Sequence, residues 1–406
     1  MILVGTYTNI DGLFIGAVAG DAGLAAINFA WPIVAFITSV GTGIGMGGAV
    51  MVNHLRGQNN TAAGESAKSA GVLLLALVGI AVTVLAAAAY RPLLILMGAE
   101  GEALRYAENY SLVVSLGALL QVLGAGMVVL LRNEGKTVHA MLYTLAGLVV
   151  HIVLDFLLVK RYSLYGVAFS TVVSQLVVAV LCLASFRMRP DVHGLRTYAG
   201  GIIQASTAPF GLNFVPSAVL LFTNAFAMKA GGTEMVSAYA VMSYAVYTYD
   251  YLCQGVCDGI QPIISYCHGA KDVAQRKRAV KTAACILAIA AGGFIALTPA
   301  LMRLMPRIFL VSGKTEGFIQ RGFLIYGFSY PLKALVKLVC AYYYSVKDHW
   351  ISNLLTYLDP MLFTPLTLWL LTSAVGENGI WMSLPVSQAA ILLAFPVILL
   401  VRKRKK

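Results

Sequence analysis

Charged residues are scarce in this sequence, and their scarcity excludes two classes of protein. Asp, Glu, Lys and Arg make up 11% of the 406 residues, whereas hydrophobic residues make up 59%. A soluble globular domain carries about 25% charged residues, and a disordered chain is poor in large apolar ones. The composition therefore indicates a polytopic membrane protein.

The sequence also lacks the residue patterns of several kinds of site. Its six cysteines lie almost wholly in apolar segments, without His or Cys partners at zinc spacing. We therefore expect packing thiols rather than disulfides or a structural metal site. No DxxD motif occurs, which disfavours the alternative of a membrane-embedded polyprenyl transferase that binds magnesium and phosphate. The N-terminus has no basic region or cleavage site, so no secretory signal is expected.

The basic residues lie in short connectors and in the C-terminal RKRKK at 402–406, although the net charge is +12. They form no charged face, so nucleic-acid binding is not expected. Alternate connectors, counted together with the tail, hold about twice as many Lys and Arg as the opposite set. Because cytoplasmic loops are the ones enriched in Lys and Arg, both termini are predicted to lie on the cytoplasmic side of the cell membrane.

Runs of apolar residues predict the membrane-spanning helices. A helix needs roughly 20 such residues to cross a bilayer. Breaks at polar, Gly and Pro clusters divide the chain into twelve segments of this kind: 1–18, 23–52, 66–89, 103–131, 137–159, 164–186, 202–228, 236–266, 279–305, 317–345, 350–373 and 379–401.

The two halves of the chain are related by an internal repeat. Sliding the chain by 212 residues places Gly20, Gly43, Gly47 and Gly57 on Gly232, Gly255, Gly259 and Gly269. A slide of 213 residues places GVAFSTVVSQ, residues 166–175, on GIWMSLPVSQ, residues 379–388. Each half holds six segments, an even number, so the repeat is parallel, and such repeats commonly enclose a substrate path.

The predicted fold class is an all-α polytopic membrane protein of twelve transmembrane helices in two six-helix lobes. The predicted domains are an N-terminal lobe, a cytoplasmic linker and a C-terminal lobe with a basic tail, at 1–186, 187–201 and 202–406. The repeat aligns Met1 with Asn213, inside the segment 202–228. This alignment predicts that the first helix is truncated at its start.

A carboxylate interrupts the apolar run LVVHIVLDFLLVK at 148–160. Asp155 lies one helical turn after His151, so both side chains lie on one face of the helix. An ionised side chain inside a membrane helix costs a few kcal/mol and marks a functional site by default. A pair of near-interface polar groups that simply reach water is the alternative. The repeat-mate of Asp155 is Leu368, which predicts that the ion site belongs to the first lobe alone.

Two lysines lie one turn apart in the segment 317–345. Lys333 and Lys337 repel each other at this spacing unless they are countered. Depths counted from the helix ends place Lys337, Asp258 and Asp359 at one level, so we predict a buried ionic cluster of these three. Lys333 and Asp250 form a looser second pair in this prediction. A structural lock and a role in substrate binding or gating both remain open.

Aromatic side chains crowd the segment 236–266. Tyr244, Tyr247 and Tyr251, together with Gln254, are candidates for a substrate cleft, because aromatic faces attract organic cations. Ordinary packing is the alternative for most of them.

Several segments resemble the multidrug and toxic compound extrusion (MATE) family, in order and nearly end to end. They are YTNIDGLFIG at 7–16, GLAAINFAWPI at 23–33, LRNEGKT at 131–137, HIVLDFLLV at 151–159 with GVAFSTVVSQ, and GIQPIISYCHGAKD at 259–272.

The resemblance implies a cation or proton site made of Asp11, Tyr7, Asp155 and Thr171, with His151 in place of the family's Asn. It also implies an antiporter, not an enzyme, that exports amphipathic and often cationic organic compounds in exchange for H+ or Na+, with a possible Na+ at Asp11 and Asp155. The histidine departs from the pattern and favours protons, because imidazole titrates near pH 6.5. No other cofactor and a monomeric state are expected. A flippase of the same superfamily that moves a lipid-linked saccharide is the nearest alternative.

Overall fold

The computed structural model describes residues 2–186, 191–309, 311 and 313–404, without the side chains of 2–13, 16, 17, 20, 21, 24, 233 and 401–404. Throughout this described part the regular structure is helical, with no strand. Helices are the expected solution for apolar segments, since a backbone in lipid must satisfy its hydrogen bonds within its own segment.

The chain forms two compact units, which we call the N-unit and the C-unit. The N-unit contains Ile2–Phe214 and Ser265–Lys271, and the C-unit contains Val215–Ile264 and the chain from Asp272 onward. The helix α7 passes from one unit to the other, and its last residues return to the N-unit. The domain boundaries predicted from the sequence stay a prediction.

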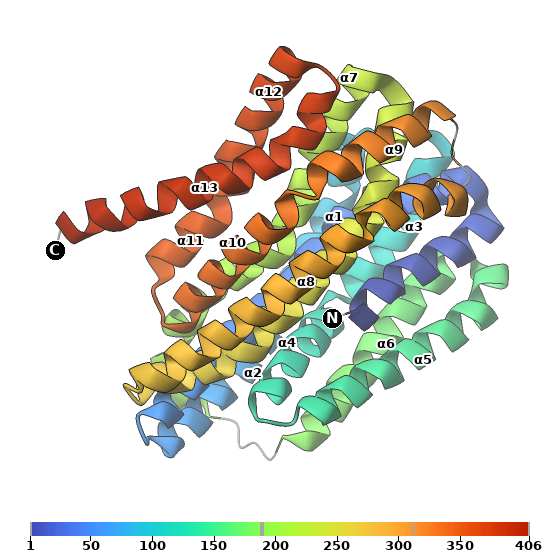
Figure 1. Ribbon diagram of the computed structural model, residues 1–406. Helices are drawn as coiled ribbons and strands as arrows, with labels where there is room; N and C mark the ends of the chain where they lie inside the picture. The colour runs from blue at the N-terminus through green and yellow to red at the C-terminus, as the bar shows by residue number, and fades with distance from the viewer. Residues whose placement is uncertain (1, 187–190, 310, 312, 405–406) are drawn as a thin grey trace. The chain divides into compact units, whose positions relative to one another are not determined.

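The helices of the N-unit follow one another through short connections (Figure 1). They are α1 (Ile2–Gly57), α2 (Thr61–Leu96), α3 (Gly101–Leu116), α4 (Ala118–Asn133), α5 (Thr137–Tyr162), α6 (Leu164–Ser185) and the start of α7 (Val192–Gly269). The helices α5 and α6 lie side by side, and α1 packs on both α2 and α4.

The C-unit holds the remainder of α7 and the later helices (Figure 1). These are α8 (Val273–Ile308), α9 (Gly313–Tyr326), α10 (Ser329–Ser345), α11 (His349–Leu358), the π-helix η1 (Asp359–Phe363), α12 (Thr364–Val375) and α13 (Asn378–Arg404). The helix α13 packs on α12 and α10, and α8 packs on α10.

The described helices confirm an all-α fold with many membrane spans. Eight are long and apolar enough to cross a membrane, or ten if each of two bent pairs is one span. These ten coincide with ten of the twelve predicted segments. Of the other two, 1–18 has most of its side chains outside the described residues, and 236–266 is helical as the later part of α7.

The structure corrects where several helices break. The segments predicted as 1–18 and 23–52 form the one helix α1. Two predicted single helices are bent pairs, by 60° between α3 and α4 and by 52° between α9 and α10. In α7 the irregularity is confined to Gly232, whose φ of 68° and ψ of −157° are not helical. Glycine adopts a positive φ without the steric strain that a side chain adds.

Glycines at the ends of α1 and α7 allow their backbones to touch. A Cβ on Gly57 would collide with the carbonyl oxygen of Tyr266, and one on Gly269 would collide with that of His54. The two glycines are repeat-mates. His54 and His268 lie beside this contact with their ring centroids 5.3 Å apart. The repeat therefore includes a close contact between equivalent positions within the N-unit.

We predict that Gly269→Ala lowers the stability of the protein, because the backbone that its Cβ meets cannot rotate away. Overpacking of this kind costs about 1–3 kcal/mol. The measurement is the melting temperature of the purified protein in detergent. Gly292→Ala on α8 is the matched control, since a Cβ at Gly292 meets no atom within 4 Å. Equal melting temperatures for the two variants would contradict the prediction.

Candidate functional site

The predicted pair on α5 is fully enclosed. His151 and Asp155 each have 0% exposure, and Nε2 of His151 lies 3.2 Å from Oδ2 of Asp155. The contact spans one helical turn, so the α-helix itself positions both groups. The alternative of polar groups that reach water is wrong for this conformation, because neither side chain is exposed.

A histidine and a carboxylate in contact can hold a proton together. With a neutral imidazole and an ionised carboxylate, the pair carries one negative charge in a medium that solvates it poorly. One added proton makes the pair electrically neutral overall, whichever of the two groups carries it. Burial therefore makes the state of the pair depend on proton uptake.

The other members predicted for this site are placed less completely. Thr171 lies on α6, and its hydroxyl donates to the carbonyl of Val167 at 3.0 Å. The side chains of Tyr7 and Asp11 lie outside the described residues, so their positions in the site remain predictions.

In the C-unit, both lysines of α10 bind the same carboxylate. Nζ of Lys333 lies 2.8 Å from Oδ1 of Asp250, and Nζ of Lys337 lies 2.6 Å from Oδ2. Lys337 also donates to Oε1 of Gln254 at 3.3 Å, and Nε2 of Gln254 donates to Oδ1 of Asp258 at 2.8 Å. The predicted Lys333–Asp250 pair is present, but it is part of the main cluster.

The predicted partners of Lys337 need correction. Its ion pair is with Asp250, and Asp258 is joined to it through the amide of Gln254. Asp359 belongs to a different group, where it accepts hydrogen bonds from Gln388 and Thr364. The reason is geometric: one carboxylate has two oxygens, so Asp250 satisfies both lysines and removes the need for a second acid.

Gln388 is a polar residue of the C-unit that the sequence prediction missed. It is 4% exposed and donates to Asp359 from the neighbouring α13. A signal was present, because Gln388 is the last residue of the repeated motif that ends in VSQ. A buried glutamine at equivalent positions of both halves is a reason to look for polar partners.

The residues predicted for a substrate cleft do not line a common pocket among the described ones. Tyr244 is 48% exposed and stacks on Phe309, with ring centroids 5.1 Å apart. Tyr247 and Tyr251 are partly buried, and Gln254 is engaged by the lysine cluster. Their role in binding substrate stays a prediction.

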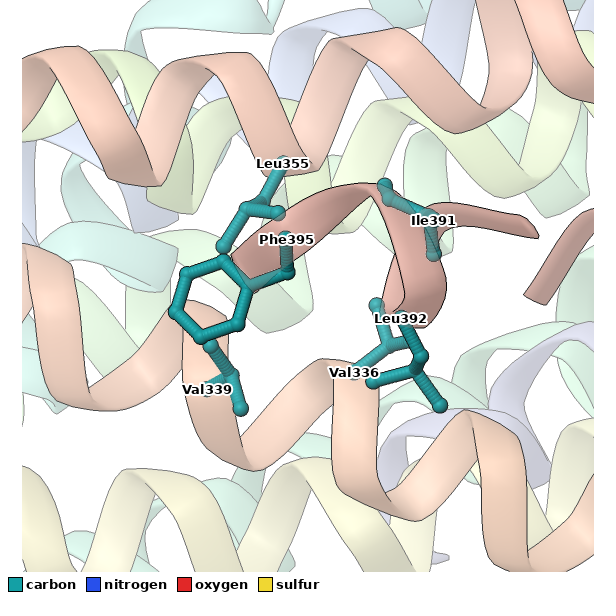
Figure 2. Close-up of a pocket in the computed structure, with 6 residues that line it drawn as sticks. All are labelled: Val336, Val339, Leu355, Ile391, Leu392 and Phe395. Atoms are coloured by element: carbon teal, nitrogen blue, oxygen red, sulfur yellow. The ribbon is translucent and has the colours of Figure 1, made fainter. Parts of the chain in front are cut away.

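A small apolar cavity lies between α10, α11 and α13 of the C-unit (Figure 2). Its volume is about 10 Å³, and it is lined by Val336, Val339, Leu355, Ile391, Leu392 and Phe395. A space of this size holds about one water molecule and offers it no polar partner. The cavity is a packing defect and not a substrate site.

The motif LRNEGKT takes part in an ionic network of the N-unit. Its Glu134 accepts from Arg56 at 2.7 Å and from Lys68 at 3.4 Å. Nearby, Asp191 caps α7 by accepting from the backbone N–H of Gly194 at 2.8 Å, and it accepts from Ser66 on α2 at 2.5 Å. The hydrogen bond from Ser66 lowers the pKa of Asp191 below its usual value. These contacts fasten the start of α7 to α2.

Comparisons of sequence agree with these observations. The family model described as MatE matches residues 1–157. The multidrug export protein MepA of Staphylococcus saprophyticus is 24% identical over 285 residues, which are 68% of this chain and 63% of that protein. MepA of Staphylococcus aureus strain MRSA252 is 22% identical over 64% of this chain and 60% of that protein. The matches therefore span less than two thirds of these relatives.

Solved structures share the fold over the whole chain. A MOP superfamily transporter from Pyrococcus furiosus, described as having a binding pocket of reverse polarity, superposes with a TM-score of 0.90 at 20% identity. A multidrug resistance MATE family transporter in an outward-facing conformation gives 0.87 at 19% identity. Each match covers 100% of this chain and 92% of the other. At these identities the likeness establishes the fold.

Proposed function

We propose, from the premise that this chain belongs to the multidrug and toxic compound extrusion family, that it is a secondary antiporter. It exports amphipathic, often cationic organic compounds in exchange for H+ or Na+ by alternating access of its two halves. The MepA relatives, described as multidrug export proteins, support the substrate class. Consistent with their being transporters, we assign this chain no enzymatic activity.

The buried pair His151–Asp155 carries this proposal. Its atoms lie 3.2 Å apart at 0% exposure in a helix that is apolar enough to span a membrane. A group of this kind is expensive to keep in lipid, and transporters use such groups to bind the ion that drives them. The imidazole favours H+ over Na+, because Na+ is held by oxygen ligands and imidazole offers nitrogen.

Transport requires that the ion prefer one conformation over the other. An ion with equal affinity for both states shifts neither, however tightly it binds. In this proposal Asp11 and Asp155 supply the differential affinity, and His151 tunes it. Uptake of a proton neutralises the buried charge and so changes which state is favoured.

The membrane orientation follows from the distribution of basic residues. We infer that both termini lie in the cytoplasm and that the protein works as a monomer in the cell membrane, with the coupling ion as its only cofactor. Alternate connectors and the tail at 402–406 hold the excess of Lys and Arg that cytoplasmic loops carry.

Dye efflux from proteoliposomes tests the function. We expect an imposed pH gradient to drive export and its collapse by a protonophore to stop it, because the pair exchanges protons. A sodium gradient is imposed in a separate preparation at equal pH on both sides. Export driven by sodium alone would overturn the assignment to protons. The absence of export under both gradients would overturn the antiport function.

A further inference from the structure

A second polar group in a membrane helix lies in the C-unit, around Asp359. Its carboxylate is partly accessible, whereas the side chains behind it are enclosed: Thr364 is 1% exposed, Ser387 0% and Gln388 4%. Oδ1 accepts from the hydroxyl of Thr364 at 3.3 Å, and Oδ2 accepts from Nε2 of Gln388. The carboxylate therefore faces an opening and is held by neutral donors from behind.

The charge of Asp359 has no close counter-charge. Among the described residues it makes no ion pair. Lys333, the cation whose charge acts on Asp359, is already bound to Asp250 at 2.8 Å. An ionised carboxylate is retained in such surroundings only if it is paired or coordinates a metal ion, or else it takes up a proton.

A second and independent observation comes from the amide of Gln388. Its Oε1 is buried and has no hydrogen-bond partner within the part of the chain that the structure describes. The Nε2 of the same amide donates to Asp359, so the orphaned oxygen is held near the carboxylate. A buried acceptor without a donor marks the place of an absent ligand. A proton on Asp359 would neutralise the carboxylate without reaching this oxygen as the amide is placed, whereas a cation satisfies both groups.

The local backbone assembles these oxygens. Residues five apart lie on different faces of an α-helix, but the π-helix η1 brings Thr364 next to Asp359 and lets its N–H donate to the carbonyl of Asp359. Pro360 follows Asp359 and has no N–H, so it leaves the carbonyl four residues earlier without its usual donor. Single π-turns of this kind are frequent at functional sites.

The repeat gives the site a counterpart. With the slide of 213 residues, Thr364 falls on His151 and Gln388 falls on Gln175. The segments that hold Asp359 and Gln388 are thus equivalent to α5 and α6, the helices of the first proposed site. The carboxylate does not align with Asp155, because Asp359 precedes Leu368 along the helix. The alignment by position concealed it.

We infer that Asp359, Thr364 and Gln388 form a binding site for a monovalent cation in the C-terminal half. The donors are oxygens of a carboxylate, a hydroxyl and an amide, the set that hard cations such as Na+ prefer. One negative charge on Asp359 matches one positive charge on the ion. The site is distinct from His151–Asp155 and revises the prediction that only the first half binds an ion.

Sodium binding to the purified full-length protein tests this inference without any need for transport. We expect NaCl, compared with choline chloride at the same pH and ionic strength, to raise the melting temperature, because a ligand that binds the folded state stabilises it. Radioactive sodium binding gives the affinity directly. Asp359→Asn is expected to weaken binding by at least about tenfold. Ser373→Ala, which removes an exposed hydroxyl of α12, is the matched control and is expected to bind as the wild type does.

A gain of binding separates the inference from a general loss of structure. Gln388→Glu adds a second carboxylate oxygen donor at the orphaned position, so we expect tighter sodium binding. Three results would overturn the inference: no sodium-specific binding by the wild type, binding unchanged in Asp359→Asn, or binding lost in Asp155→Asn alone. None of them bears on the proton-driven export proposed above, which is measured separately in proteoliposomes.

Discussion

Asp155→Asn is expected to reduce pH-driven export to the level of protein-free liposomes, while the protein still folds and inserts. The substitution keeps the shape of the side chain and its ability to accept a hydrogen bond from His151, which lies 3.2 Å away. It removes the one carboxylate of the described pair, and an amide does not titrate in this pH range. Without that charge, proton uptake no longer changes the free-energy difference between the two conformations.

The measurement is dye efflux under an imposed pH gradient, with reconstituted protein quantified in each preparation. Asp272→Asn is the matched control, because it makes the same chemical change at the N-cap of α8, where Asn caps as well as Asp does. Undiminished efflux in Asp155→Asn would show that the coupling ion binds elsewhere. His151→Asn, which retains Asp155, is expected to keep export and to change its dependence on pH.

The sequence predicted the helical spans well because their cause is local. A run of apolar residues long enough to cross a bilayer must form a helix in lipid, whatever packs around it. The bends were not predictable in the same way. The 60° bend beside Gly117 and the π-helix at Asp359–Phe363 each depend on how a neighbouring helix packs. Composition alone does not contain that information.

The candidate site was predictable where it depended on one helix. His151 and Asp155 meet because residues four apart always share a helical face. The partner of Lys337 was not, because counting depth from helix ends assumes straight helices with a common boundary. The 52° bend before α10 and the extra residue of the π-turn after α11 break that assumption. Asp250 then lies within 2.6 Å of Lys337, although it was assigned to another pair.

Asp250→Ala is expected to cause the largest loss of stability of any single substitution in the C-unit. Asp250 is the carboxylate that binds both Lys333 and Lys337, at 2.8 and 2.6 Å, and all three residues are mostly or wholly buried. Its removal leaves two like charges one helical turn apart in a medium of low polarity. Breaking a buried ion pair by removing one partner costs about 3–5 kcal/mol. Thermal unfolding of the purified protein in detergent measures the effect.

A compensating substitution distinguishes lost pairing from lost packing. If the uncompensated lysines cause the damage, Lys333→Met and Lys337→Met introduced together with Asp250→Ala should restore most of the melting temperature, since apolar side chains of similar length carry no charge to solvate. If the cavity left by Asp250 causes it, the triple variant should be no more stable than the single one. The same triple variant also separates a lock from a binding role, because a purely structural cluster can be made apolar without loss of export. Loss of export in a stable triple variant would instead assign the lysines to substrate binding or gating.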